Sequence, residues 1–239
     1  MKSRPGNSPI VVGGFTALTT IDYPGELAAV IFMQGCPWHC GYCQNSDLLP
    51  SQSDSSIHWS EILSTLEKRK GLLDAVVFSG GEPTLQSGLE SAMQQVKAMG
   101  FKIGLHTAGI YPDRLQKVLR LTDWVGMDIK SAKADYDKIT GVNGSATKAW
   151  KSARAIMGSG VAYEFRTTLH PDMLDRQQLS QLVKELIELG AENYVIQQCE
   201  TKYCLDEAKR VVTSAGLESD FINQLGHRFS HFEIRGDFI

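Results

Sequence analysis

The sequence predicts an α/β fold, an open partial (β/α)6 barrel made of a parallel sheet with helices outside. Short apolar runs alternate with stretches of helical period, which is typical of parallel strands joined by right-handed crossovers. About six such pairs are present, too few for a closed eight-stranded barrel. The 239 residues, 42% of them apolar, suffice to bury one core. We therefore expect one domain over 1–239, with an N-terminal extension (1–26), a barrel core (27–200) and a C-terminal helix and edge strand (201–239).

Six apolar runs are predicted to be strands, at residues 27–33, 75–78, 102–105, 124–127, 162–166 and 194–196. Helical periodicity between and after them predicts helices near 60–70, 87–99, 113–119, 146–157, 175–189 and 206–215. In the clearest helix, Asp175 is the expected N-cap and Gly190 the stop. Residues 228–235 alternate loosely and are expected to add an edge strand.

Composition excludes several classes of function. A net charge of −3 without a block of Lys and Arg gives no sign of a nucleic-acid partner. The N-terminus lacks the apolar core of a signal peptide, and the longest apolar run, 27–33, is too short to cross a membrane. Five cysteines, three of them clustered, suit a reducing compartment. We expect a cytoplasmic protein with no nucleic-acid or membrane partner.

Three of those cysteines, Cys36, Cys40 and Cys43, have the spacing C-x3-C-x2-C. Soft thiolates on one short loop suit a cubane iron–sulfur cluster, and the lack of a fourth cysteine nearby leaves one iron open to another ligand. A zinc knuckle is the alternative, but zinc normally takes two C-x-x-C pairs or a Cys/His set. His39 adjoins Cys40 and would point differently. Disulfides are the least favoured interpretation.

Chemically distinctive residues follow every predicted strand. Because ligands bind beyond the carboxyl ends of parallel strands, these segments are expected to form one site. Strand by strand they are the cysteine loop, Ser79-Gly80-Gly81-Glu82-Pro83, His106-Thr107-Ala108-Gly109, Asp128-Ile129-Lys130, Arg166-Thr167-Thr168 and Gln197-Gln198-Cys199.

The cysteine loop followed by Gly-Gly-Glu-Pro at a strand end resembles the radical SAM superfamily, whose fold is also a partial barrel. The resemblance implies that Cys36, Cys40 and Cys43 hold a [4Fe–4S] cluster and that S-adenosylmethionine chelates its fourth iron. An electron from the cluster would then cleave the sulfonium. The resulting 5′-deoxyadenosyl radical abstracts a hydrogen atom, while the protein orients the cofactors.

Further site residues follow from the same resemblance. Gly80, Gly81 and Glu82 match the segment that holds the methionyl amine, although Gly-Gly-Glu-Pro alone could be an ordinary turn. Tyr42 matches an aromatic position near the adenine, with core packing as the alternative.

Two charged segments complete the expected site. Asp128 and Lys130 resemble an Asp-x-Lys segment that contacts the methionine portion in glycyl-radical-enzyme activases, and a surface ion pair is the alternative. Arg166 matches an arginine of those activases and suits a carboxylate or ribose hydroxyls, unless it is simply solvated.

The runs Gly13-Gly14-Phe15, Thr20-Ile21-Asp22-Tyr23-Pro24-Gly25 and Gln34-Gly35-Cys36 resemble anaerobic ribonucleoside-triphosphate reductase activating proteins. That likeness implies a protein substrate, the anaerobic reductase, from one glycine of which a hydrogen is removed. It also implies a low-potential electron donor such as flavodoxin or ferredoxin. A small-molecule enzyme such as a 7-carboxy-7-deazaguanine synthase is the first alternative, and a non-catalytic iron–sulfur or zinc module is the second.

Some residues depart from the activase pattern. Gln44 follows Cys43 where many activases carry histidine, although Asn45 is retained. His106 stands where related activases often have a cation-binding aspartate; histidine is a poor ligand for such a cation, so no cation site is expected unless Asp128 and backbone carbonyls form it. His106 is expected to be a packed strand-end histidine, with a hydrogen bond to the cofactor or substrate as the alternative. Cys199 and Cys204 are expected to be semi-buried thiols, with protection of the cluster or relay of electrons or hydrogen as alternatives.

Overall fold

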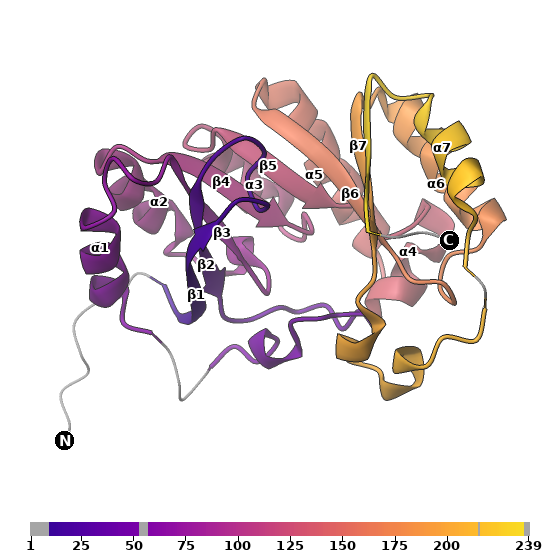
Figure 1. The fold of residues 1–239 in the computed structure, drawn as a ribbon, viewed down its shortest axis with the longest axis horizontal. Coiled ribbons are helices and arrows are strands. Elements are labelled where there is room, and N and C mark those ends of the chain that lie inside the picture. Colours follow the sequence, from indigo (N-terminus) through magenta and orange to yellow (C-terminus); the bar gives the residue numbers. More distant parts are fainter. Residues whose placement is uncertain (1–9, 53–56, 215, 237–239) are drawn as a thin grey trace.

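The computed structural model describes residues 10–52, 57–214 and 216–236. Its strands form one open sheet whose order follows the chain, with helices packed around the outside (Figure 1). The first pair is antiparallel and every later pair is parallel. The predicted α/β fold with an open parallel sheet is confirmed. The strands are β1 (Val12–Thr19), β2 (Ala28–Met33), β3 (Ala75–Gly80), β4 (Lys102–Thr107), β5 (Trp124–Asp128), β6 (Ala162–Leu169), β7 (Asn193–Gln198) and β8 (His231–Arg235).

Helices fill the connections between parallel strands. They are α1 (Trp59–Glu67), α2 (Leu89–Ala98), α3 (Pro112–Leu119), α4 (Lys133–Thr140), α5 (Ser145–Ser159), α6 (Arg176–Leu189) and α7 (Ser219–Gly226). Short 3-10 helices add η1 (Ser46–Leu48), η2 (Pro83–Leu85), η3 (Thr201–Tyr203) and η4 (Glu207–Arg210). The caps predicted for α6 are confirmed, since Asp175 and Gln178 form a capping box and Gly190 ends the helix at φ +89°. None of the helices in the described ranges is long and apolar enough to span a bilayer.

The helix predicted near 206–215 is wrong. Asp206 does accept a hydrogen bond from the Ala208 amide, but the chain makes only the short η4. Val211 and Val212, which would form the apolar face, are 67% and 41% exposed, so no burial stabilises a longer helix. Ala215 lies outside the described residues. The C-terminal helix is α7, and α4 is a further helix that periodicity did not indicate.

The sheet begins at Val12, earlier than residue 27, because part of the expected N-terminal extension forms β1. Gly13 has no side chain at a point where a Cβ would lie 2.3 Å from the Gln34 Oε1. This close approach lets the amide of Gln34 reach the loop that follows β2. The predicted edge strand at the other end of the sheet is confirmed as β8.

The sheet separates two apolar cores. Along β2, Ala29, Ile31 and Met33 pack with the helices, whereas Ala28 and Val30 pack on the opposite, concave face. On that face Tyr23, from the β1–β2 turn, lies 5.2 Å from the ring of Trp124, at the amino end of β5. The concave side is therefore filled at the amino ends of the strands and stays free for a ligand at their carboxyl ends.

We predict that Tyr23→Ala lowers the free energy of unfolding by about 3 kcal/mol, because it opens a cavity beside Trp124. Urea denaturation measures the change. Tyr203→Ala is the matched control, since Tyr203 is 57% exposed and its truncation should cost less than about 0.5 kcal/mol. Equal losses for the two variants would show that the Tyr23–Trp124 contact contributes nothing of its own.

Candidate functional site

A cavity of about 330 Å³ lies at the carboxyl ends of the parallel strands. This volume is at the lower end of the range for small-molecule and cofactor sites. Its lining comes from the loop after β2 and from the ends of β3 to β7. The predicted site residues that line it are Cys36, Cys40, Tyr42, Cys43, Gly80, Gly81, Asp128, Lys130 and Arg166. The structure thus brings all of them together except Glu82.

The cysteine loop is held by backbone and amide hydrogen bonds. The Gln34 Nε2 donates to the carbonyls of Asp47 and Pro50, at 2.9 and 2.8 Å. The Cys36 amide donates to Leu49, and the Cys43 amide donates to the Cys40 carbonyl at 2.9 Å. These bonds fix the backbone from which the three thiols project.

The donor set fits a cluster rather than a single ion. All five cysteines are free of disulfides. Within the described ranges, no three His, Cys, Asp or Glu residues are grouped so that they could hold one metal ion. Zinc needs all its ligands at about 2.0–2.3 Å from one centre, whereas a cubane binds each thiolate through a different iron atom. Three soft thiolates on one loop are compatible with a cubane.

Burial favours the protonated form of two of these thiols, Cys36 and Cys40. Desolvation raises the pKa of Cys36 to about 12, although a hydrogen bond from the Trp38 backbone opposes it. Desolvation also raises the pKa of Cys40, and the positive charge of Lys130 opposes that rise. Because metal binds thiolates, loading this site must release protons.

Two aromatic residues of the lining carry polar atoms without partners. Tyr42 is 5% exposed and Trp38 is 2% exposed. Across the described parts of the chain, nothing hydrogen-bonds the buried Tyr42 Oη or the buried Trp38 Nε1. A buried polar group left unpaired costs about 1–3 kcal/mol. A polar ligand in the cavity would offset this cost, which supports the fit of the site to a bound cofactor.

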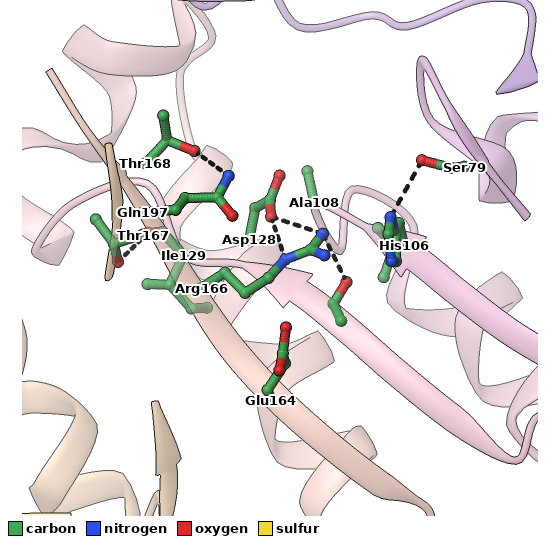
Figure 2. A network of polar contacts seen from close by, with 12 residues as sticks. Ser79, His106, Ala108, Asp128, Ile129, Glu164, Arg166, Thr167, Thr168 and Gln197 are labelled. Carbon is green, nitrogen blue, oxygen red and sulfur yellow. Dashed lines mark hydrogen bonds and ion pairs between the residues drawn. The ribbon is translucent and has the colours of Figure 1, made fainter. Parts of the chain in front are cut away.

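Asp128 lies between two cations. Its Oδ2 accepts from the Lys130 Nζ at 3.1 Å, and its Oδ1 accepts from the Arg166 Nε at 3.0 Å. Figure 2 shows the Arg166 guanidinium reaching from β6 to this carboxylate at the end of β5. The guanidinium lies over Gly126, where a Cβ would come within 2.8 Å of its Nη1. Together, Asp128, Lys130 and Arg166 carry one net positive charge, so they complement an anionic ligand.

Mutual attraction keeps these groups ionised. Burial opposes the charge on Asp128, but the attraction of Lys130 and Arg166 outweighs it and holds the pKa of the carboxyl below its ordinary value. Burial likewise opposes the charge on Lys130, and the attraction of Asp128 raises the pKa of the ammonium well above its ordinary value. Lys130 also lies 5.6 Å from the centre of the Tyr42 ring.

The carboxylate of Glu82 points away from the cavity lining. It accepts from the Thr84 amide at 3.0 Å, the Thr107 hydroxyl at 2.7 Å and the Ala108 amide at 2.9 Å. The Thr84 hydroxyl is a fourth donor, at 2.5 Å. The side chain is fully buried and ties the segment after β3 to the segment after β4. The carboxylate of Glu82 is therefore fully occupied by hydrogen bonds within the protein.

His106 is held by two hydrogen bonds, although it also lines the cavity. Its Nε2 lies 2.8 Å from the carbonyl of Asp22, which can only accept, so Nε2 carries the proton. Its Nδ1 accepts from the Ser79 hydroxyl at 3.3 Å (Figure 2). Burial, reinforced by repulsion from Arg166, lowers the pKa of His106 to about 3. The contacts agree with the predicted packed strand-end histidine.

Three polar residues of the lining had no individual role in the sequence analysis: Asp22, Thr168 and Gln197, although Thr168 and Gln197 belong to two of the predicted strand-end segments. Gln197 donates to the Thr168 hydroxyl at 2.8 Å, across the β6–β7 pair (Figure 2). Thr168 follows Arg166 by two residues on one strand, so period two would have placed it on the same face. Asp22 comes from the β1–β2 turn, which only the tertiary fold carries to the cavity.

Comparison with known proteins identifies the family. The model of the radical SAM superfamily matches residues 30–178, more than half of the chain, including the cysteine loop and Arg166. The chain belongs to the radical SAM superfamily. This family uses a [4Fe–4S] cluster and S-adenosylmethionine, so the predicted cofactors and the prediction of a radical SAM enzyme are confirmed at the level of the family.

Related sequences include activating enzymes. The chain is 30% identical over 204 residues to a Methanocaldococcus jannaschii protein named provisionally as a glycyl-radical enzyme activating enzyme, covering 82% of this chain and 83% of that protein. It is also 30% identical over 176 residues to the pyruvate formate-lyase-activating enzyme of Clostridium pasteurianum, with 70% and 73% covered. A match of 30% to the 7-carboxy-7-deazaguanine synthase of Thermococcus kodakarensis covers only 47% of this chain and 53% of that protein.

Solved structures share the fold. Streptococcus suis SuiB bound to its precursor peptide SuiA superposes with a TM-score of 0.66 at 15% identity, covering 87% of this chain and 48% of SuiB. At this identity the likeness concerns the fold alone. It places the partial barrel among radical SAM structures and leaves the substrate open.

We predict that acid weakens the fold through His106. Its pKa is depressed in the folded state, so its neutral form contributes stability above the unfolded pKa of about 6.5, and this is lost as pH falls toward about 3. Wild type should lose about 1 kcal/mol more than His106→Gln between pH 7 and pH 5.5.

Urea unfolding at the two pH values measures this difference. His227→Gln, at an exposed histidine, is the control and should keep the wild-type dependence on pH. The idea fails if His106→Gln and wild type lose the same stability.

Proposed function

We propose that the chain is a radical SAM activase that installs a glycyl radical on anaerobic ribonucleoside-triphosphate reductase. The proposal rests on one observation: three cysteines of one loop line the same cavity as Asp128, Lys130 and Arg166. Relatives named as glycyl-radical enzyme and pyruvate formate-lyase activating enzymes support the class of reaction. The N-terminal run Thr20-Ile21-Asp22-Tyr23-Pro24-Gly25 supports the choice of reductase.

Cys36, Cys40 and Cys43 would hold the [4Fe–4S] cluster, and S-adenosylmethionine would occupy the rest of the cavity. Together, when bound, these cofactors supply one-electron reduction and the abstraction of a hydrogen atom. The chain contributes binding and orientation.

The charged group would orient the anionic end of S-adenosylmethionine. Arg166 is 8% exposed and presents a planar fork suited to a carboxylate or to ribose hydroxyls. Asp128 holds both cations in place. Gly80 and Gly81 would contribute backbone groups to the methionyl amine, and Glu82 would contribute its carbonyl, because hydrogen bonds already occupy its carboxylate. Tyr42 would lie near the adenine.

We also propose a low-potential donor such as flavodoxin or ferredoxin, a cytoplasmic location and a single domain over 1–239. The reductase loop that carries the glycine would have to enter the cavity at the strand ends. An open barrel admits such a segment, whereas a closed one would not.

We predict a glycyl doublet in the EPR spectrum of anaerobic reductase after incubation with reconstituted protein, S-adenosylmethionine and a reductant. Cys40→Ala should give no doublet, because it removes one thiolate of the cluster. Pyruvate formate-lyase serves as the competing protein substrate. A doublet on that enzyme alone would reject the reductase as target, and 5′-deoxyadenosine formed only with a pterin substrate would favour the deazaguanine synthase instead.

We predict that Arg166→Lys raises the KM for S-adenosylmethionine by about 10- to 100-fold, since a hydrogen bond to a charged group contributes about 1.5–3 kcal/mol. Formation of 5′-deoxyadenosine over a range of concentrations gives the KM. Arg120→Lys is the matched control, because the Arg120 side chain is 66% exposed and distant from the cavity lining. An unchanged KM in Arg166→Lys would remove Arg166 from the proposed site.

A further inference from the structure

Cys199 and Cys204 lie side by side although five positions separate them. Their sulfur atoms are 3.7 Å apart, with Cys199 5% and Cys204 0% exposed. They pack with Tyr42, Ile139 and Met173 in a small apolar cluster of their own. Neither lines the cavity, so the proposed cofactor site does not account for them.

The segment 199–206, here called the strap, is bound directly to the cysteine loop. The Leu205 amide donates to the Cys43 carbonyl, and the Asp206 amide donates to the Gly41 carbonyl, both at 2.9 Å. The Gln44 side chain, next to Cys43, donates to the Cys199 sulfur at 3.6 Å. A change at the thiol pair is therefore a change beside the loop of the three other cysteines.

We propose that Cys199 and Cys204 form a thiol–disulfide pair. This pair is a modification site that a small disulfide, such as glutathione disulfide, oxidises by removing two electrons. One thiol displaces a glutathione thiol from the oxidant, and the second thiol displaces the other glutathione thiol. One S–S bond forms between the cysteines and one is lost from the oxidant. Both cysteine protons pass to the two glutathione thiols, so atoms and electrons balance.

The geometry permits this bond but makes it alter the strap. A disulfide is about 2.05 Å long, so the sulfur atoms must approach by roughly 1.7 Å from their present separation. The exposed residues Lys202 and Tyr203 lie between the two cysteines, so this part of the strap is at the protein surface. Burial raises the pKa of Cys199 to about 12, which keeps this thiol protonated and slows its attack on an oxidant.

Closing the bond should loosen the cysteine loop. The Cys199 sulfur would move away from the Gln44 amide, and the two strap amides that donate to the carbonyls of Gly41 and Cys43 would shift with it. We therefore expect oxidised protein to release iron to a chelator at least three times faster than reduced protein. The faster release of iron depends on the proposed cluster and hence on the proposed function, whereas formation of the disulfide does not.

The test begins with anaerobically reconstituted holoprotein, in which the cluster occupies the other cysteines. After treatment with glutathione disulfide and alkylation, trypsin cleaves at Lys202, between the two thiols. Mass spectrometry should find a disulfide-linked peptide pair in most molecules, reversed by dithiothreitol. Cys204→Ser should give instead a glutathione adduct on Cys199. Separate glutathione adducts on both cysteines of wild type would overturn the proposal.

A second probe covers the case in which burial blocks the oxidant. Phenylarsine oxide bridges two adjacent thiols, so wild-type holoprotein should bind one molecule, located by mass spectrometry on Cys199 and Cys204. Absence of both the disulfide and the arsenical adduct would overturn the pair. Equal iron release from oxidised and reduced protein, with the disulfide present, would overturn only its coupling to the cysteine loop and leave the proposed function untouched.

Discussion

Parallel pairing of β2 to β7 in chain order is the constraint on which the site depends. In this register Met33 lies opposite Gly80, Asp128 opposite Arg166 and Thr168 opposite Gln197. The last two pairs are also the hydrogen-bonded pairs of the cavity. A slip of one residue would turn the side chains of these last two pairs toward the helix-covered face. The register that pairs the strands therefore also assembles the chemistry.

Asp128 and Glu82, two acidic groups near the cavity, are stabilised in different ways. Asp128 has two cationic partners and stays ionised, leaving one net positive charge for a ligand. Glu82 has no cationic partner among its hydrogen bonds and relies on four neutral donors, so burial raises its pKa. A buried charged group without such partners would cost several kcal/mol. Asp128 thus prepares the ligand site, whereas Glu82 braces the loops around it.

The sequence patterns predicted those elements that depend on interactions between residues close in the chain. Apolar runs gave β2 to β7, and the Asp175 and Gly190 caps gave α6, because periodicity and caps act within a few residues. Strand β1 escaped prediction because Gly13 and Gly14 break its alternation, and only pairing with β2 makes it a strand. The orientation of Glu82 escaped for a similar reason, since its donors Thr107 and Ala108 come from the end of another strand. Spacing predicts which chemistry meets at the strand ends, but contacts across strands decide where each side chain points.

Two attachments position the cysteine loop from opposite sides. On the β3 side, the Glu82 amide donates to the Gly35 carbonyl at 2.9 Å, and a Cβ at Gly81 would lie 2.3 Å from that oxygen. Gly80, at φ +113°, would place a Cβ 2.3 Å from the Met33 amide nitrogen. Gly80 and Gly81 therefore allow the backbone after β3 to contact the backbone at the end of β2 closely. On the other side the loop is bound by the strap. Both attachments use backbone hydrogen bonds, but only the strap carries two thiols, so the proposed disulfide would act on the loop from the strap and not from β3.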